Sequence, residues 1–157
     1  MHANNKLGRE QLAELITNLF SKNMPFNQLL GFEVRAISQD KVEVHFDWHD
    51  KLMGNPSYKI LHGGVTAAVL DTVGGAMAAL YAAKDMQDYS DQAFLSTLSK
   101  LGTIDMRVDY LRPGKGESFV ASAEVIRKGS KVAVCRMELH NQDNTQIALG
   151  TATYMVG

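Results

Sequence analysis

One carboxylate stands alone in a long apolar run of this sequence. Between Gly63 and Ala83 the only charged side chain is Asp71, and most of its neighbours are Ala, Gly, Val, Leu or Met. A helix without a polar face is a buried helix, and an isolated buried charge must be paired, protonated or in use. We therefore expect Asp71 to be buried and to suit acid–base chemistry, with a structural carboxylate that caps a neighbouring loop as the alternative.

Two glycines stand at the start of this apolar run. Gly63 and Gly64 precede the expected helical run, where the first turn leaves backbone N–H groups without partners within the helix. These donors and the helix dipole favour negative charge, so they suit a carbonyl oxygen that becomes negative in a transition state. We expect both amides to be free, two turns before Asp71, although the same glycines are also typical of a tight turn.

Hydrophobic periodicity predicts the elements that position these groups in the first part of the chain. Apolar residues at helical spacing indicate an amphipathic helix, and a proline and a glycine bracket a short second helix. Strict alternation of apolar and polar residues then indicates strands. In chain order, we expect helices over 9–23 and 25–30, strands over 32–37 and 42–48, and a loop over 50–59.

The chain after the apolar helix is dominated by strand patterns. We expect a helical piece with a loop over 85–101, then strands over 104–110, 118–127, 132–140 and 146–156. Short turns between these strands imply antiparallel pairing. One all-apolar helix and one such sheet predict an α+β fold in which the sheet wraps around the long helix.

Composition limits the classes of function. A chain of 157 residues is expected to form one domain, and a formal net charge of −1 argues against nucleic acid as a partner. Cys135 is the only cysteine, which excludes an intrachain disulfide, and the histidines show no spacing for metal ligands, so we expect no metal and no cofactor. The first ten residues lack the apolar run of a signal peptide, so we expect a cytoplasmic protein without membrane insertion.

Several short motifs in order along the chain resemble one family. Asn55-Pro56, then Leu61-His62-Gly63-Gly64, then Asp71 resemble hotdog-fold acyl-CoA thioesterases of the phenylacetic-acid-degradation type. The segments 103–113 and 150–154 are similar to that family's third and last strands. The resemblance implies a hotdog fold over 32–157, preceded by an N-terminal helical segment over 1–31, within a single domain overall.

The same resemblance implies roles for particular residues and a partner. Asp71 would activate or position the attacking water, or attack the thioester directly, and the Gly63 amide of a second subunit would polarise the carbonyl. His62 would support that loop, Asn55 would help hold the carbonyl, and Thr103 would hold a water. The implied assembly is a homodimer with its sites at the interface, often paired further into a homotetramer.

Basic residues offer a site for the nucleotide end of coenzyme A (CoA). Because the protein is nearly neutral, attraction for the anionic CoA must come from a local cluster. Two turns at opposite ends of the strand over 118–127 are candidates, with Gly residues that leave N–H groups for phosphate oxygens. The family favours the second turn, and an ordinary solvated surface is the alternative reading. The candidate substrate-binding residues are Gly64, Arg112, Arg127, Lys128 and Lys131.

Alternative functions differ in chemistry. An acyl-thioester hydratase or dehydratase would pair a histidine with an acid, and no second histidine is well placed beside His62. A non-catalytic acyl-CoA sensor would bind the substrate without releasing free CoA. The unbranched apolar residues around Met53, Met77, Leu80 and Phe94 favour a medium or long fatty acyl chain.

Overall fold

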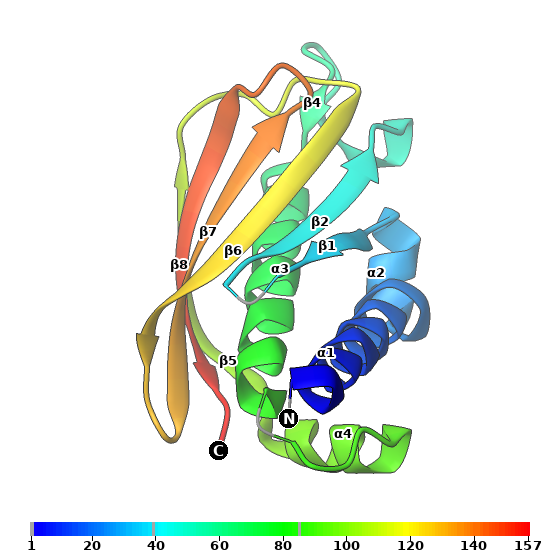
Figure 1. Ribbon diagram of the computed structural model, residues 1–157. Coiled ribbons are helices and arrows are strands. Elements are labelled where there is room, and N and C mark those ends of the chain that lie inside the picture. The colour runs from blue at the N-terminus through cyan, green and yellow to red at the C-terminus, as the bar shows by residue number, and fades with distance from the viewer. Residues whose placement is uncertain (1, 39, 85) are drawn as a thin grey trace.

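A curled antiparallel sheet wraps around one long helix, α3 (Gly63–Ala83), as Figure 1 shows. The computed structural model describes residues 2–38, 40–84 and 86–157. The six strands of the sheet run in the order β1-β2-β6-β7-β8-β5, and all neighbours are antiparallel. Their bounds are β1 Glu33–Ile37, β2 Val42–Asp47, β5 Gly102–Tyr110, β6 Ser118–Lys128, β7 Val132–Asn141 and β8 Gln146–Met155. This confirms the expected α+β hotdog architecture.

The central helix is buried because its side chains are short and apolar. Val69, Leu70, Val73 and Ala76 are fully buried, and α3 packs chiefly on β6 and β7. By length and composition α3 is the one helix of the described residues that could cross a membrane, but 61% of its most apolar window is buried in the fold. It is therefore the core helix on which the sheet closes.

The N-terminal helices cover the other side of α3. The expected helix over 9–23 begins earlier, because α1 spans His2–Thr17 and continues as a π-helix over Asn18–Asn23. Leu12, Ile16 and Phe20 point into the core from this segment. Helix α2 (Pro25–Leu30) has Pro at its first position and ends at Gly31, which takes the left-handed conformation with φ 72°.

Two connections carry more structure than their sequences indicated. The expected loop over 50–59 contains a 3-10 turn, η2 (Asp50–Leu52), and the first strand of a small ribbon, β3 (Met53–Asn55) with β4 (Ile60–Leu61). Strands of three and two residues are too short to show a period of two, so this part of the prediction was wrong. The expected helical piece over 85–101 is present as α4 (Asp91–Thr97) and the 3-10 turn η3 (Leu98–Lys100), while residue 85 lies outside the described residues.

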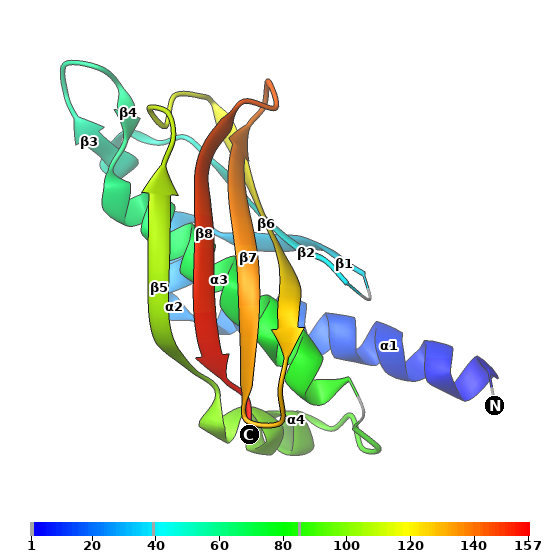
Figure 2. The same ribbon diagram turned by 90° about the vertical axis from the view of Figure 1, so that its left-hand side faces the viewer.

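Strand β5 forms a free edge of the sheet. Figure 2 shows β5 at this edge, with α3 behind the sheet and the β3–β4 ribbon projecting beyond the start of α3. Ile104 and Tyr110 of this strand are each 57% exposed, and Leu111, which follows it, is 46% exposed. An edge strand with large exposed apolar side chains is a ready surface for pairing with another chain.

Candidate active site

Two hydroxyl groups meet the Asp71 carboxylate on the flank of α3. Thr103 Oγ1 donates to Asp71 Oδ1 over 2.9 Å, and Tyr154 Oη lies 3.2 Å from the same oxygen. Tyr154 Oη also lies 3.1 Å from the backbone oxygen of Asp71. Asp71 is half-buried and not buried as expected, because its flank of α3 faces the open side beside β5. The carboxylate is thus paired but still accessible.

A β-bulge directs Thr103 toward α3. Thr103 stands opposite Tyr154 on β8, but the register shifts before Asp105, which stands opposite Thr153. Without this shift Thr103 and Asp105 would share one face of the strand. Instead, Thr103 faces the helix, and the Asp105 carboxylate accepts the Thr153 N–H at 3.0 Å. The bulge therefore places two cross-strand neighbours, Thr103 and Tyr154, on one carboxylate.

Tyr154 was missed from the sequence as a site residue. Its ring is 1% exposed, and its hydroxyl reaches α3 where Gly74 has no side chain. The Gly74-Gly75 pair one turn beyond Asp71 is the signal for it in the sequence. Burial, together with the nearby charge of Asp71, raises the pKa of Tyr154 far above its ordinary range, so its hydroxyl remains a donor.

The start of α3 is capped by a histidine. The His62 Nδ1 atom accepts the Gly64 N–H at 2.8 Å, so the expectation of a free Gly64 amide was wrong. Gly63 N–H has no hydrogen-bond partner within the described part of the chain. The Tyr110 hydroxyl donates to the Gly63 carbonyl oxygen at 2.9 Å and fixes this peptide from β5. One backbone donor therefore remains available at the helix start.

A shallow hollow lies beside that available amide. It has a volume of about 350 Å³ and is lined by Gly63, Thr66, Tyr110, Leu111 and Pro113, among others. A larger hollow of about 740 Å³ lies elsewhere, where α1 and β6 flank the C-terminal half of α3, and neither Asp71 nor Gly63 lines it. The candidate site is therefore identified by the positions of the Gly63 amide and the Asp71 carboxylate, and not by which hollow is larger.

The available donor and the carboxylate are too far apart to act together within one chain. Gly63 and Asp71 are separated by eight residues of one helix, which corresponds to about 12 Å along its axis. A single thioester carbonyl cannot be held by the Gly63 amide and attacked from Asp71 of the same chain. One chain therefore does not bring these two groups together.

Asn55 is held in a turn at the end of the β3–β4 ribbon. Its side-chain oxygen accepts the Ser57 N–H at 3.0 Å, and its backbone oxygen accepts the Tyr58 N–H at 3.1 Å. Asn55 is exposed, and no hydrogen bond joins it to Asp71 or Gly63 in the described residues. The structure does not bring Asn55 to the carboxylate, and the turn explains the residue type.

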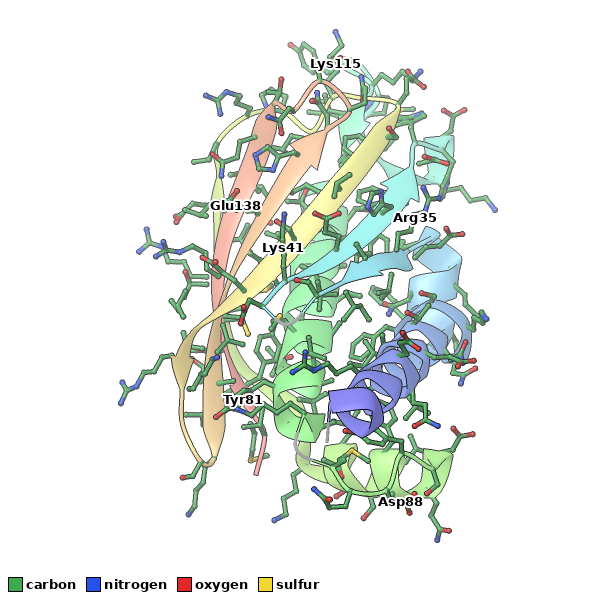
Figure 3. All side chains as sticks on the ribbon, viewed as in Figure 1. Arg35, Lys41, Tyr81, Asp88, Lys115 and Glu138 are labelled. Atoms are coloured by element: carbon green, nitrogen blue, oxygen red, sulfur yellow. The ribbon has the colours of Figure 1, made fainter. Side chains whose placement is uncertain are left out.

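The basic residues fall into two groups at opposite ends of β6. Arg112 donates to the Gln146 backbone oxygen at 2.9 Å, so part of its guanidinium is already engaged. Arg127, Lys128 and Lys131 are exposed around the β6–β7 turn. Tyr81, which donates to the Gly129 carbonyl oxygen at 3.3 Å, marks that end in Figure 3, and Lys115 marks the other. One chain therefore does not unite the two groups.

The fold and the site geometry define a hotdog-fold protein whose central helix carries an accessible carboxylate. Residues 58–148 match the Thioesterase superfamily, and the chain belongs to this family. Medium/long-chain acyl-CoA thioesterase YigI of Escherichia coli (strain K12) is 42% identical over 151 residues, which cover 96% of this chain and 97% of that protein. The chain is therefore a thioester hydrolase.

Solved structures agree with this assignment. A Shewanella oneidensis protein related to the thioesterase superfamily has 47% identity and a TM-score of 0.88, covering 96% of this chain and 98% of its own. A thioesterase from Haemophilus influenzae has 21% identity and a TM-score of 0.70, covering 88% and 85% of the two chains. The second likeness supports the fold alone. Within the described residues, no group of three His, Cys, Asp or Glu side chains is placed to hold a metal ion.

Proposed function

We propose that this protein hydrolyses acyl-CoA thioesters with a medium or long fatty acyl chain, at a site shared by two chains. The observation that carries the proposal is the accessible Asp71 carboxylate, held by the Thr103 hydroxyl on the open flank of α3. The substrate class is supported by the name of the E. coli relative, a medium/long-chain acyl-CoA thioesterase. The long apolar residues of the core, including Met77 and Phe94, favour the same acyl class.

The proposed reaction transfers the acyl group to water. In the base route, Asp71 takes a proton from water, the resulting hydroxide attacks the carbonyl carbon, and the Gly63 N–H of the second chain stabilises the oxyanion. Collapse of the tetrahedral intermediate breaks the C–S bond, and protonated Asp71 returns its proton to the CoA thiolate. In the nucleophile route, Asp71 attacks the carbonyl carbon and expels the CoA thiolate to form a mixed anhydride. Water then cleaves the anhydride to the free acid and the Asp71 carboxylate, and the proton that is released protonates the thiolate. Both routes need the same carboxylate at the same place.

The second chain is proposed to dock at β5 and the adjacent flank of α3. Gly64, Ala67 and Ala68 leave this flank lined by small residues and partly open, next to the exposed Ile104 of β5. Small residues allow a second helix to approach closely, and the free edge of β5 can extend the sheet. The assembly is a homodimer, with further pairing into a homotetramer kept as a prediction from the family.

The remaining assignments follow from this arrangement. His62 caps α3 through Nδ1 and so orients the Gly63 amide, and within the described residues this histidine is not paired with an acid as a hydratase would need. Residues 1–31 are proposed as a helical segment added to a hotdog domain over 32–157, and Leu12 and Ile16 pack it on the core. A cytoplasmic location and the absence of nucleic-acid or cofactor binding stay predictions.

A panel of acyl-CoAs with a thiol reagent tests this proposal, with Asp71→Asn as the matched variant. We expect free CoA to appear fastest from medium or long acyl chains. The amide keeps the side-chain shape but cannot act as a base or nucleophile, so turnover should fall by roughly 10²–10⁴-fold. Thr103→Ala should cost less, because a water can replace a hydroxyl. A loss below tenfold in Asp71→Asn, or binding of acyl-CoA without release of CoA, would remove Asp71 from this role.

A further inference from the structure

Tyr154 contacts two oxygens of the same aspartate. Its hydroxyl lies 3.1 Å from the Asp71 backbone oxygen and 3.2 Å from Asp71 Oδ1. A single group that bonds both the main chain and the carboxylate of one residue restricts the rotation of that side chain. Because Tyr154 is 1% exposed in the core between the sheet and α3, the hydroxyl itself has little freedom to move.

Both hydroxyl donors of the site use the same carboxylate oxygen. Thr103 and Tyr154 reach Oδ1, whereas Oδ2 accepts no hydrogen bond within the described residues. No described buried side-chain oxygen lacks a partner, so the half-buried Asp71 must expose Oδ2 to solvent. The arrangement leaves one oxygen held and the other directed to the open flank.

The helix has a notch for the tyrosine hydroxyl. A Cβ atom added at Gly74 would fall on the Tyr154 hydroxyl and would lie 2.9 Å from its Cζ atom. At the neighbouring Gly75, an added Cβ would meet Phe20 at 3.6 Å and Tyr154 at 3.8 Å, which are ordinary contacts. Only the first glycine is therefore required for Tyr154 to approach Asp71.

We propose that Tyr154, seated in the notch left by Gly74, is a positioning residue that holds Asp71 Oδ1 so that Oδ2 is the reacting oxygen. The inference rests on the proposed role of Asp71 as base or nucleophile and adds the group that aims it. Tyr154 does not exchange its own proton in the reaction. Its buried hydroxyl stays protonated and donates to the ionised carboxylate before the reaction begins.

Tyr154→Phe is the direct test, because it removes only the hydroxyl from a packed ring. The loss of one donor to a charged group should lower kcat about tenfold or more, with KM for acyl-CoA nearly unchanged. In an Asp71→Asn background the same change should cost nothing further, since the group that it positions is already disabled.

Gly74→Ala places a methyl group where the Tyr154 hydroxyl lies and so displaces that hydroxyl from the helix side. Gly75→Ala is its matched control. We expect Gly74→Ala to lower kcat at least as much as Tyr154→Phe, and Gly75→Ala to retain the activity of the unmodified protein. The double variant Gly74→Ala/Tyr154→Phe should be no slower than the slower single variant, because both changes disrupt one contact. Thermal unfolding of each variant identifies any that has lost its fold.

The outcomes separate this inference from the proposed function. If Asp71→Asn kept its turnover, the role of Asp71 itself would fail. If Asp71→Asn lost turnover while Tyr154→Phe kept an unaltered kcat, the positioning role alone would be overturned. A lower kcat in Tyr154→Phe that was matched by a further loss of the same size in the Asp71→Asn background would also overturn it.

Discussion

Neutral hydroxyls, and not a cation, hold the carboxylate at the centre of the site. Among the described residues, no Lys, Arg or His forms an ion pair with Asp71, whereas Thr103 and Tyr154 donate to it. An adjacent guanidinium would stabilise the ionised form strongly and weaken the base. Hydroxyl donors fix the orientation of the group while leaving it able to accept a proton.

Cys135 offers a residue-scale test of the packing behind this site. Its thiol is fully buried against α3, and burial raises its pKa from 9.0 to about 12. An ionised thiolate is tolerated in the unfolded chain but not in the fold. Its share of stability is therefore fully present below about pH 8.5 and is lost as the pH rises toward about 12.

The measurement is the free energy of unfolding from urea titrations between about pH 9 and pH 10. A single group that is ionised in the unfolded chain and neutral in the fold lowers the free energy of unfolding by about 1.4 kcal/mol per pH unit in this window. We expect Cys135→Ala to show a decline shallower by about that amount than the unmodified protein. Equal slopes in the two proteins would mean that the thiol ionises as easily in the fold as in the unfolded chain.

At the residue scale, a site residue was predictable where its type is unusual for its segment, and was missed where its position depends on how two strands are paired. Asp71 was recognisable because it is the one charge in an apolar run, and Thr103 through the family motif. Tyr154 was not recognisable, because its contact with Asp71 depends on a bulge in β5 and on the notch at Gly74. The Gly64 amide was misjudged because a histidine at the N-cap position can bond to it.

At the element scale, long periodic segments were predicted well and short ones were not. The bounds of α3 and α2 match the expectation, and β6, β7 and β8 differ from it by one residue at an end. The three strands each bury one face and α3 is apolar along its whole length, so their patterns are visible in the sequence, whereas α2 is marked by Pro25 and Gly31. Ribbon β3–β4 and the N-terminal extension of α1 lack such a pattern, because neither presents a regular apolar face.

The β6–β7 turn carries an element-scale prediction about the nucleotide. Lys128 lies 6.0 Å from the centre of the Tyr81 ring, and the hydroxyl of Tyr81 bonds the turn at Gly129. These two contacts of Tyr81 hold the exposed basic turn in one position. We expect Lys128→Ala/Lys131→Ala to raise KM for acyl-CoA at low salt with kcat nearly unchanged, because uniform binding is lost.

The same double variant has two internal checks. The effect should shrink at high salt, since these charges are exposed, and an acyl-pantetheine thioester, which lacks the nucleotide, should show no change. Lys22→Ala/Lys51→Ala removes the same total charge elsewhere on the surface and should leave KM unchanged. An unaltered KM in Lys128→Ala/Lys131→Ala at low salt would make this turn ordinary surface.

At the scale of the whole molecule, we propose that one chain carries half of a site. The Gly63 amide and Asp71 lie on the same helix, eight residues apart, or about 12 Å along its axis. The open flank of α3 and the free edge of β5 lie together on the side where Asp71 is accessible. A second copy docked there would bury this surface and bring its own Gly63 toward Asp71.

Complementation between two inactive chains tests this central claim most directly. Asp71→Asn disables the carboxylate, and Gly63→Pro removes the amide donor with little strain. Proline suits the first position of a helix, and His62 already has the extended backbone that a following proline requires, with φ −61° and ψ 137°. Each variant alone should form dimers with little or no turnover.

The decisive measurement is the thioesterase activity of the two variants after refolding together in equal amounts, with mixed dimers verified by native mass spectrometry. Half of randomly assorted dimers are mixed, and each of these holds one complete site out of two. The mixture should therefore regain about one quarter of the activity of the unmodified protein. Mixed dimers without regained activity, or a fully active monomer in sedimentation, would contradict a site shared between two chains.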